Sequence, residues 1–140
     1  MAEIDRLRGK TRPEFRNLAI PEILSYRMPP AAIVSILHRV SGVLLFLVGI
    51  PFVLYLFQNS ITSELSFQTY RAAVASWLGK LVLLVLIWAF VHHLLAGIRF
   101  LTLDLHIGGD REPSALTARI VLGLGVAITL ICALPLFGLI

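Results

Sequence analysis

Two clusters of polar side chains interrupt long apolar stretches of this chain. The first is Ser35-Ile-Leu-His38-Arg39, and the second is His92-His93 followed by Arg99. An arginine within a membrane-spanning helix costs roughly 2.5–3.5 kcal/mol on insertion scales. A chain carries such a cost when the charge has a partner inside the bilayer. The two clusters therefore indicate a bound polar ligand or cofactor rather than a simple anchor.

The composition of the chain is that of a membrane protein. Of its 140 residues, 58% are hydrophobic and only 14% are charged. A soluble domain of this size could not bury so much apolar surface, so lipid must cover it. The net charge of +4 comes mostly from basic residues before the first apolar stretch. These form a basic flank to a membrane span, and no nucleic acid is expected as a partner.

Three membrane-spanning helices are predicted, each close to the ~20 apolar residues that a bilayer core requires. They cover residues 31–57, 73–103 and 119–140, joined by loops around 59–70 and 104–118. The sequence thus predicts an all-α protein with an N-terminal segment (1–30) and a three-helix transmembrane domain (31–140). Pro51 and Pro135 are candidate kinks, which neighbouring helices can tolerate.

The distribution of Lys and Arg predicts the orientation in the membrane. The basic N-terminus is expected in the cytoplasm, whereas the 59–70 loop has neither Lys nor Arg and is expected outside. The 104–118 loop returns to the cytoplasm, and the C-terminus ends outside. Each polar cluster then lies toward the cytoplasmic side of its helix.

This topology predicts that His38 and His93 share one half of the bilayer on antiparallel helices. Gly97, one turn after His93, removes side-chain bulk where a flat macrocycle such as a haem could lie. Two alternatives stay open from the residues alone. Either His92 or His93 can be a hydrogen-bonded packing residue, and Arg99 is more simply read as reaching back to the cytoplasmic interface.

Two motifs together resemble the cytochrome b556 subunits of succinate dehydrogenase. The first is Arg12-Pro13 and Leu24-Ser-Tyr26-Arg27, followed by Ser35-Ile-Leu-His38-Arg39-Val-Ser41-Gly42. The second is His93-Leu-Leu-Ala-Gly97-Ile-Arg99, closing with Asp104. The combination is specific and extends over nearly the whole chain, with three helices in the expected order.

The resemblance implies a b-type haem with one axial ligand from this chain. That ligand falls on His93, with His92 as the neighbouring alternative. His38 and Arg39 would lie near the haem propionates, where hydrogen bonds and positive charge offset the carboxylates. Many relatives have His after Gly-Ile-Arg, whereas this chain has Phe100, so a polar contact near the haem edge is absent or comes from another residue.

The resemblance also implies a ubiquinone site. Ser35 would hydrogen-bond a quinone carbonyl, and Arg39 would stabilise the negative charge that develops during reduction. Met28 and Ile36 match positions that wall the quinone pocket.

The implied protein is the larger membrane anchor of respiratory complex II, in a bacterial inner membrane. Its expected partners are a second small anchor subunit, an iron–sulfur subunit and a flavoprotein, which pass electrons from succinate to ubiquinone. Alone it would be inactive. The alternatives are a haem-free structural anchor, the equivalent subunit of a fumarate reductase, and a small transporter subunit. The transporter is disfavoured because no paired acidic residue lies within the spans.

Overall fold

The computed structural model describes residues 20–139, and all regular structure in that range is helical. The elements are α2 (Ile20–Ser25), α3 (Pro30–Leu44), η1 (Leu45–Gly49), α4 (Ile50–Thr62), α5 (Glu64–Ala75), α6 (Trp77–Asp104) and α7 (Arg111–Phe137). Three helical stretches are long and apolar enough to cross a membrane: Pro30–Thr62, Trp77–Asp104 and Arg111–Phe137. The predicted all-α, three-span fold is thereby confirmed. Most of the predicted N-terminal segment, including Arg12-Pro13, lies outside the described residues.

The first span contains a π-helical segment rather than a sharp break at Pro51. Proline has no N–H to donate, and its ring collides with the carbonyl four residues earlier in an ideal α-helix. The segment η1, directly before α4, takes up this conflict by widening one turn of the helix. The helix consequently runs from Pro30 to Thr62 without interruption.

Both predicted loops are shorter than the sequence suggested. The 59–70 stretch is mostly helical, because α4 continues to Thr62 and α5 begins at Glu64. Ser63 separates them as the N-cap of α5, where it forms a capping box with Ser66. At the other end, α7 begins at Arg111, eight residues before the predicted start of the third span. Because charged residues stand at the start of α7, its hydropathy did not indicate that the helix begins this early.

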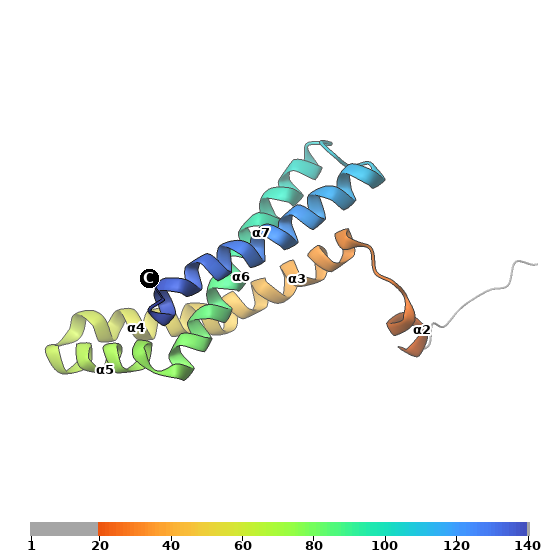
Figure 1. The fold of residues 1–140 in the computed structure, drawn as a ribbon. Coiled ribbons are helices and arrows are strands. Elements are labelled where there is room, and N and C mark those ends of the chain that lie inside the picture. Colours follow the sequence, from red (N-terminus) through yellow and green to blue (C-terminus); the bar gives the residue numbers. More distant parts are fainter. Residues whose placement is uncertain (1–19, 140) are drawn as a thin grey trace, which may run out of the picture.

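The three long helices pack around small side chains. Helix α6 contacts both α3 and α7, while α4 and α5 form a hairpin that extends beyond the end of α7 (Figure 1). A buried cluster joins the three helices and consists of Val34, Ala96, Ala118 and Val121. Alanine at two of these positions allows close helix approach, as is typical in membranes.

The corner between α5 and α6 requires a glycine. Ser76 caps α6 by accepting a hydrogen bond from the backbone N–H of Gly79. A Cβ at Gly79 would collide with the carbonyl oxygen of Ala73. At this same end, the Trp77 ring meets the Phe137 ring at 5.6 Å, which ties the start of α6 to the end of α7.

Candidate functional site

The structure brings the two polar clusters together between α3 and α6. The rings of His38 and His93 stack with their centroids 4.1 Å apart and their planes 13° apart. The Phe100 ring lies next to the His38 ring, with the two centroids 5.2 Å apart and the two planes at 56°. We call Phe100, His38 and His93 the aromatic column. It joins residues more than 50 positions apart in the sequence.

Hydrogen bonds determine which nitrogen of His93 carries the proton. Its Nδ1 lies 3.0 Å from the carbonyl oxygen of His38. A carbonyl only accepts, so Nδ1 must be the donor and Nε2 keeps its lone pair. The hydroxyl of Ser41 lies 3.2 Å from the same Nδ1 and donates to the same carbonyl at 2.9 Å. Within residues 20–139, nothing forms a hydrogen bond with Nε2 of His93.

These contacts fit the requirements of a metal-ligating histidine. Such residues almost always donate their second ring N–H to a carbonyl or carboxylate, which fixes the tautomer and the ring orientation. Ser41 is fully buried and Gly42 gives the ring room, because a Cβ there would lie 3.0 Å from Cε1 of His93. In the sequence, Ser41 and Gly42 belonged to the first motif but had no predicted role, so their contacts with His93 were not predicted. The space over Gly97, expected to admit a macrocycle, faces His38 instead: a Cβ there would lie 3.7 Å from Nε2 of His38.

His92 turns in the opposite direction, into the core of the three helices. It is only 1% exposed, and its ring stacks on Trp88 with centroids 5.5 Å apart. Its Nε2 is the one buried side-chain N or O atom without a hydrogen-bond partner among the described residues. Helix α7 closes over it, since a Cβ at Gly125 would lie 3.6 Å from Nδ1. His92 is thus enclosed by the helices of its own chain.

Arg99 is buried against α7 rather than exposed at the surface of the chain. It is 5% exposed and points at the start of α7, where Nε donates to Thr117 at 3.1 Å. Its Nη2 donates to Ser114 twice, to the carbonyl at 3.1 Å and to the hydroxyl at 2.9 Å. Within residues 20–139 it has no carboxylate partner. Its three hydrogen bonds join α6 to α7.

The residues expected at the quinone site lie on the outer surface of the chain. Arg39 is exposed and Ser35 half-buried, and neither has a hydrogen-bond partner within residues 20–139. Met28 and Ile36 are 46% and 44% exposed. The spacing of Ser35 and Arg39 places them one helical turn apart on the same side of α3. Their polar atoms are therefore free for a ligand or for another chain.

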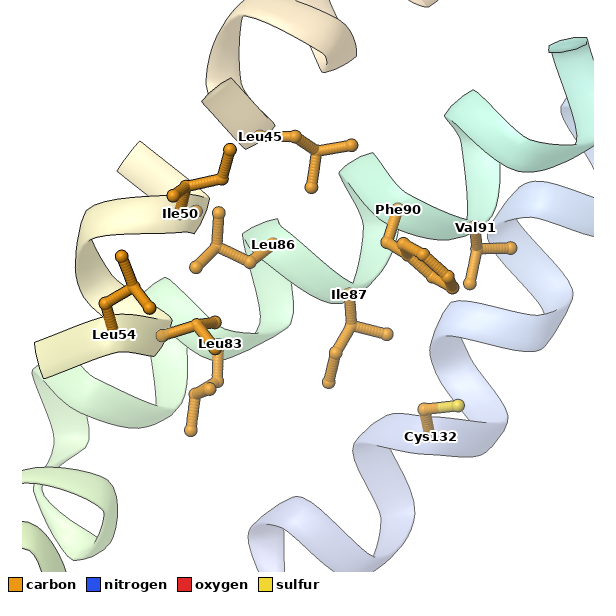
Figure 2. A pocket seen from close by; sticks show the side chains of 11 residues that line it. Leu45, Ile50, Leu54, Leu83, Leu86, Ile87, Phe90, Val91 and Cys132 are labelled. Atoms are coloured by element: carbon orange, nitrogen blue, oxygen red, sulfur yellow. The ribbon is translucent and has the colours of Figure 1, made fainter. Parts of the chain in front are cut away.

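A large apolar cavity lies elsewhere in the described part of the fold. It has a volume of about 780 Å³ and lies between η1–α4 and α6, where Ile50, Leu54, Leu86 and Phe90 line it (Figure 2). All its side chains are apolar except for the thiol of Cys132 on α7. The cavity can accommodate hydrocarbon, but it has none of the groups that a polar cofactor needs.

The fold and the site define a small integral membrane subunit with a histidine site between two of its helices. Residues 10–132 match the family model described as succinate dehydrogenase/fumarate reductase transmembrane subunit. The chain belongs to this family. It is 32% identical to the succinate dehydrogenase cytochrome b556 subunit of Paracoccus denitrificans over 117 residues, which cover 84% of this chain and 89% of the relative. It is 37% identical to the protein of the same name from Coxiella burnetii over 86 residues, 60% and 67% of the two chains.

These similarities confirm the resemblance inferred from the two motifs. The chain is a membrane anchor subunit of the succinate dehydrogenase class.

Proposed function

We propose that this chain is the haem b-binding anchor of a succinate:ubiquinone oxidoreductase, with His93 as its axial ligand. The observation that carries the proposal is the hydrogen bond from Nδ1 of His93 to the carbonyl of His38, which leaves Nε2 free to bind iron. Both relatives are named cytochrome b556 subunits, which supports a b-type haem. The enclosure of His92 by α7 and Trp88 supports His93 over the neighbouring alternative.

The neighbours of His93 suit the carboxylates of a haem. Arg39 brings a permanent positive charge to the outer surface of α3, and His38 lies directly against His93. A bound haem b supplies a one-electron carrier. His93 would hold the iron, and Arg39 and His38 would offset the charge of the propionates. A partner anchor subunit would supply the other iron ligand.

The quinone site belongs to the same surface of α3. Ser35 donates a hydrogen bond to a carbonyl of ubiquinone and orients the ring, and Arg39 stabilises the negative charge that develops on the quinone oxygen. Met28 and Ile36 present apolar surface to the ring. Oxidation of succinate belongs to a flavoprotein subunit, and an iron–sulfur subunit carries electrons from the flavoprotein to the quinone site.

The membrane orientation follows from the positions of the charges. The start of α3, the end of α6 and the start of α7 lie at one end of the bundle, together with Arg99, Arg111 and Arg119. Among residues 20–139, Arg71 and Lys80 are the only Lys and Arg residues at the opposite end. The end with the polar clusters is therefore cytoplasmic, in a bacterial inner membrane.

A reduced-minus-oxidised absorption spectrum of the purified complex tests the proposal. A low-spin b-haem band with one haem per copy of this chain is the expected result. An assembled, succinate-oxidising complex without that band would identify a haem-free structural anchor instead. Assay of succinate oxidation and fumarate reduction on the same sample then gives the preferred direction of catalysis.

A further inference from the structure

We propose that Phe100 is a positioning residue, which fixes the orientation of the His93 ring through His38. This inference rests on the proposed haem site, because it concerns the ligand to the iron. No ring contact joins Phe100 to His93 within residues 20–139. Its effect passes through the His38 ring, which it touches on one side while His93 stacks nearby.

The ring of His93 has one tightly defined position. One face lies against His38 at 4.1 Å, Nδ1 is held by the His38 carbonyl and Ser41, and the Cε1 edge faces Gly42. A nearly parallel stack restrains rotation of both rings, since either would collide with the other on turning. The hydrogen bonds hold the Nδ1 edge of His93, and the His38 ring restrains rotation of the His93 plane about that edge.

Phe100 is itself held in place from α7. The guanidinium carbon of Arg99 lies 5.7 Å from the centre of the Phe100 ring, within the range of a cation–π contact. Arg99 is in turn hydrogen-bonded to Ser114 and Thr117. The column therefore has a rigid support at the end away from His93.

The orientation of an axial imidazole has a direct spectroscopic readout. In a low-spin ferric haem with two imidazole ligands, the angle between the ring planes sets the splitting of the iron d orbitals and hence the largest g value in electron paramagnetic resonance. Ring orientation and hydrogen bonding at Nδ1 also adjust the reduction potential. A residue that only fills space would alter neither quantity.

The decisive experiment replaces Phe100 in the assembled complex. Phe100→Met and Phe100→Leu remove the ring while keeping an apolar side chain, and Phe100→Tyr retains it. Both ringless variants are expected to keep their haem but to shift the largest g value and the midpoint potential, whereas Phe100→Tyr restores the wild-type spectrum. Either ringless variant suffices for the decision if the other fails to assemble.

Phe137→Met and Phe137→Leu are closely matched controls. Phe137 is also half-buried and also contacts one aromatic ring, that of Trp77 at 5.6 Å, and one cation, Lys80 at 5.7 Å. It lies at the opposite end of the bundle, so its loss should leave the haem spectrum unchanged.

Ser41→Ala tests the hydrogen-bonded edge of the same ring. Loss of a hydroxyl that supports a metal-bound histidine is expected to weaken haem retention about tenfold. Unaltered g values in haem-loaded Phe100→Met and Phe100→Leu complexes would overturn the inference. Absence of haem from the wild-type complex would overturn the proposed function instead, so the two failures are distinguishable.

Discussion

Four residues of the two polar clusters form two pairs, one directed into the chain's own core (the inward pair) and one left open at its surface (the outward pair). The inward pair, His92 and Arg99, is almost fully buried between α6 and α7. The outward pair, His93 and Arg39, keeps an unbound ring nitrogen and an unpaired guanidinium within residues 20–139. Both pairs combine one imidazole with one guanidinium at membrane depth. Under the proposed function, the buried pair has a structural role, and the pair left open at the surface of the chain binds the ligands.

Substitution of the neighbouring histidines should give the largest difference between the two pairs. His93→Phe removes the free Nε2 and is expected to abolish the b-haem band in the assembled complex. His92→Phe keeps the ring that stacks on Trp88, and the band should persist. Absorption spectroscopy of both purified complexes makes the comparison. A band retained in His93→Phe and lost in His92→Phe would move the axial ligand by one residue and reverse the inward and outward assignments.

The inward arginine should matter for stability. A hydrogen bond to a charged group contributes about 1.5–3 kcal/mol to stability. Arg99 donates three such bonds from α6 to α7. Arg99→Lys is expected to lower the thermal stability of the complex in detergent, because an ammonium cannot serve Ser114 and Thr117 as a planar fork does. Arg119→Lys, on the exposed surface of α7, is the matched control and should have no measurable effect. Equal melting temperatures for Arg99→Lys and wild type would argue against a structural role.

The outward arginine should matter for quinone chemistry rather than stability. Arg39→Leu is expected to reduce ubiquinone reductase activity about tenfold, which corresponds to ~1.4 kcal/mol of transition-state stabilisation. Succinate oxidation with an artificial acceptor should stay near the wild-type rate. Ser35→Ala should mainly raise the apparent KM for quinone. Full quinone reduction by an assembled Arg39→Leu complex would place the quinone pocket elsewhere.

The smallest effect is expected from removing the inward imidazole. The unbonded Nε2 of His92 costs stability, since a buried polar atom without a partner loses about 1–3 kcal/mol relative to water. His92→Phe replaces it with an apolar ring of similar shape and should leave the melting temperature equal to or slightly above wild type. A large destabilisation would reveal that His92 has a polar role after all.

The sequence was sufficient to predict the helices that consist of one continuous apolar stretch. It was also sufficient to predict that the two polar clusters lie close together. It could not predict α5, because Glu64–Ala75 lacks a long apolar run and depends on its capping box at Ser63. The hydrogen-bond partners of Arg99 could not be predicted from the sequence either. A guanidinium on a flexible stem can point toward water or toward a neighbouring helix, and only the placement of Ser114 and Thr117 on α7 decides between them.

The roles of the neighbours of His93 were hidden for a related reason. Ser41 bonds to the carbonyl three residues earlier, a local arrangement common in any helix. Its proximity to Nδ1 of His93 depends on how α3 and α6 are rotated against each other. Phe100 looked like the loss of a polar contact, and its position against His38 becomes evident only from the packed helices.

The bonds of Arg99 to α7 also bear on how the chain enters the membrane. Helix α6 on its own would leave the Arg99 guanidinium without hydrogen-bond acceptors, which is unfavourable in lipid. Helix α7 supplies the missing acceptors, and only residues 105–110 separate the two helices. Insertion of α6 and α7 together as a helical hairpin would give that charge its hydrogen-bond acceptors within the chain itself, whereas Arg39 on the first span has no such acceptor among residues 20–139.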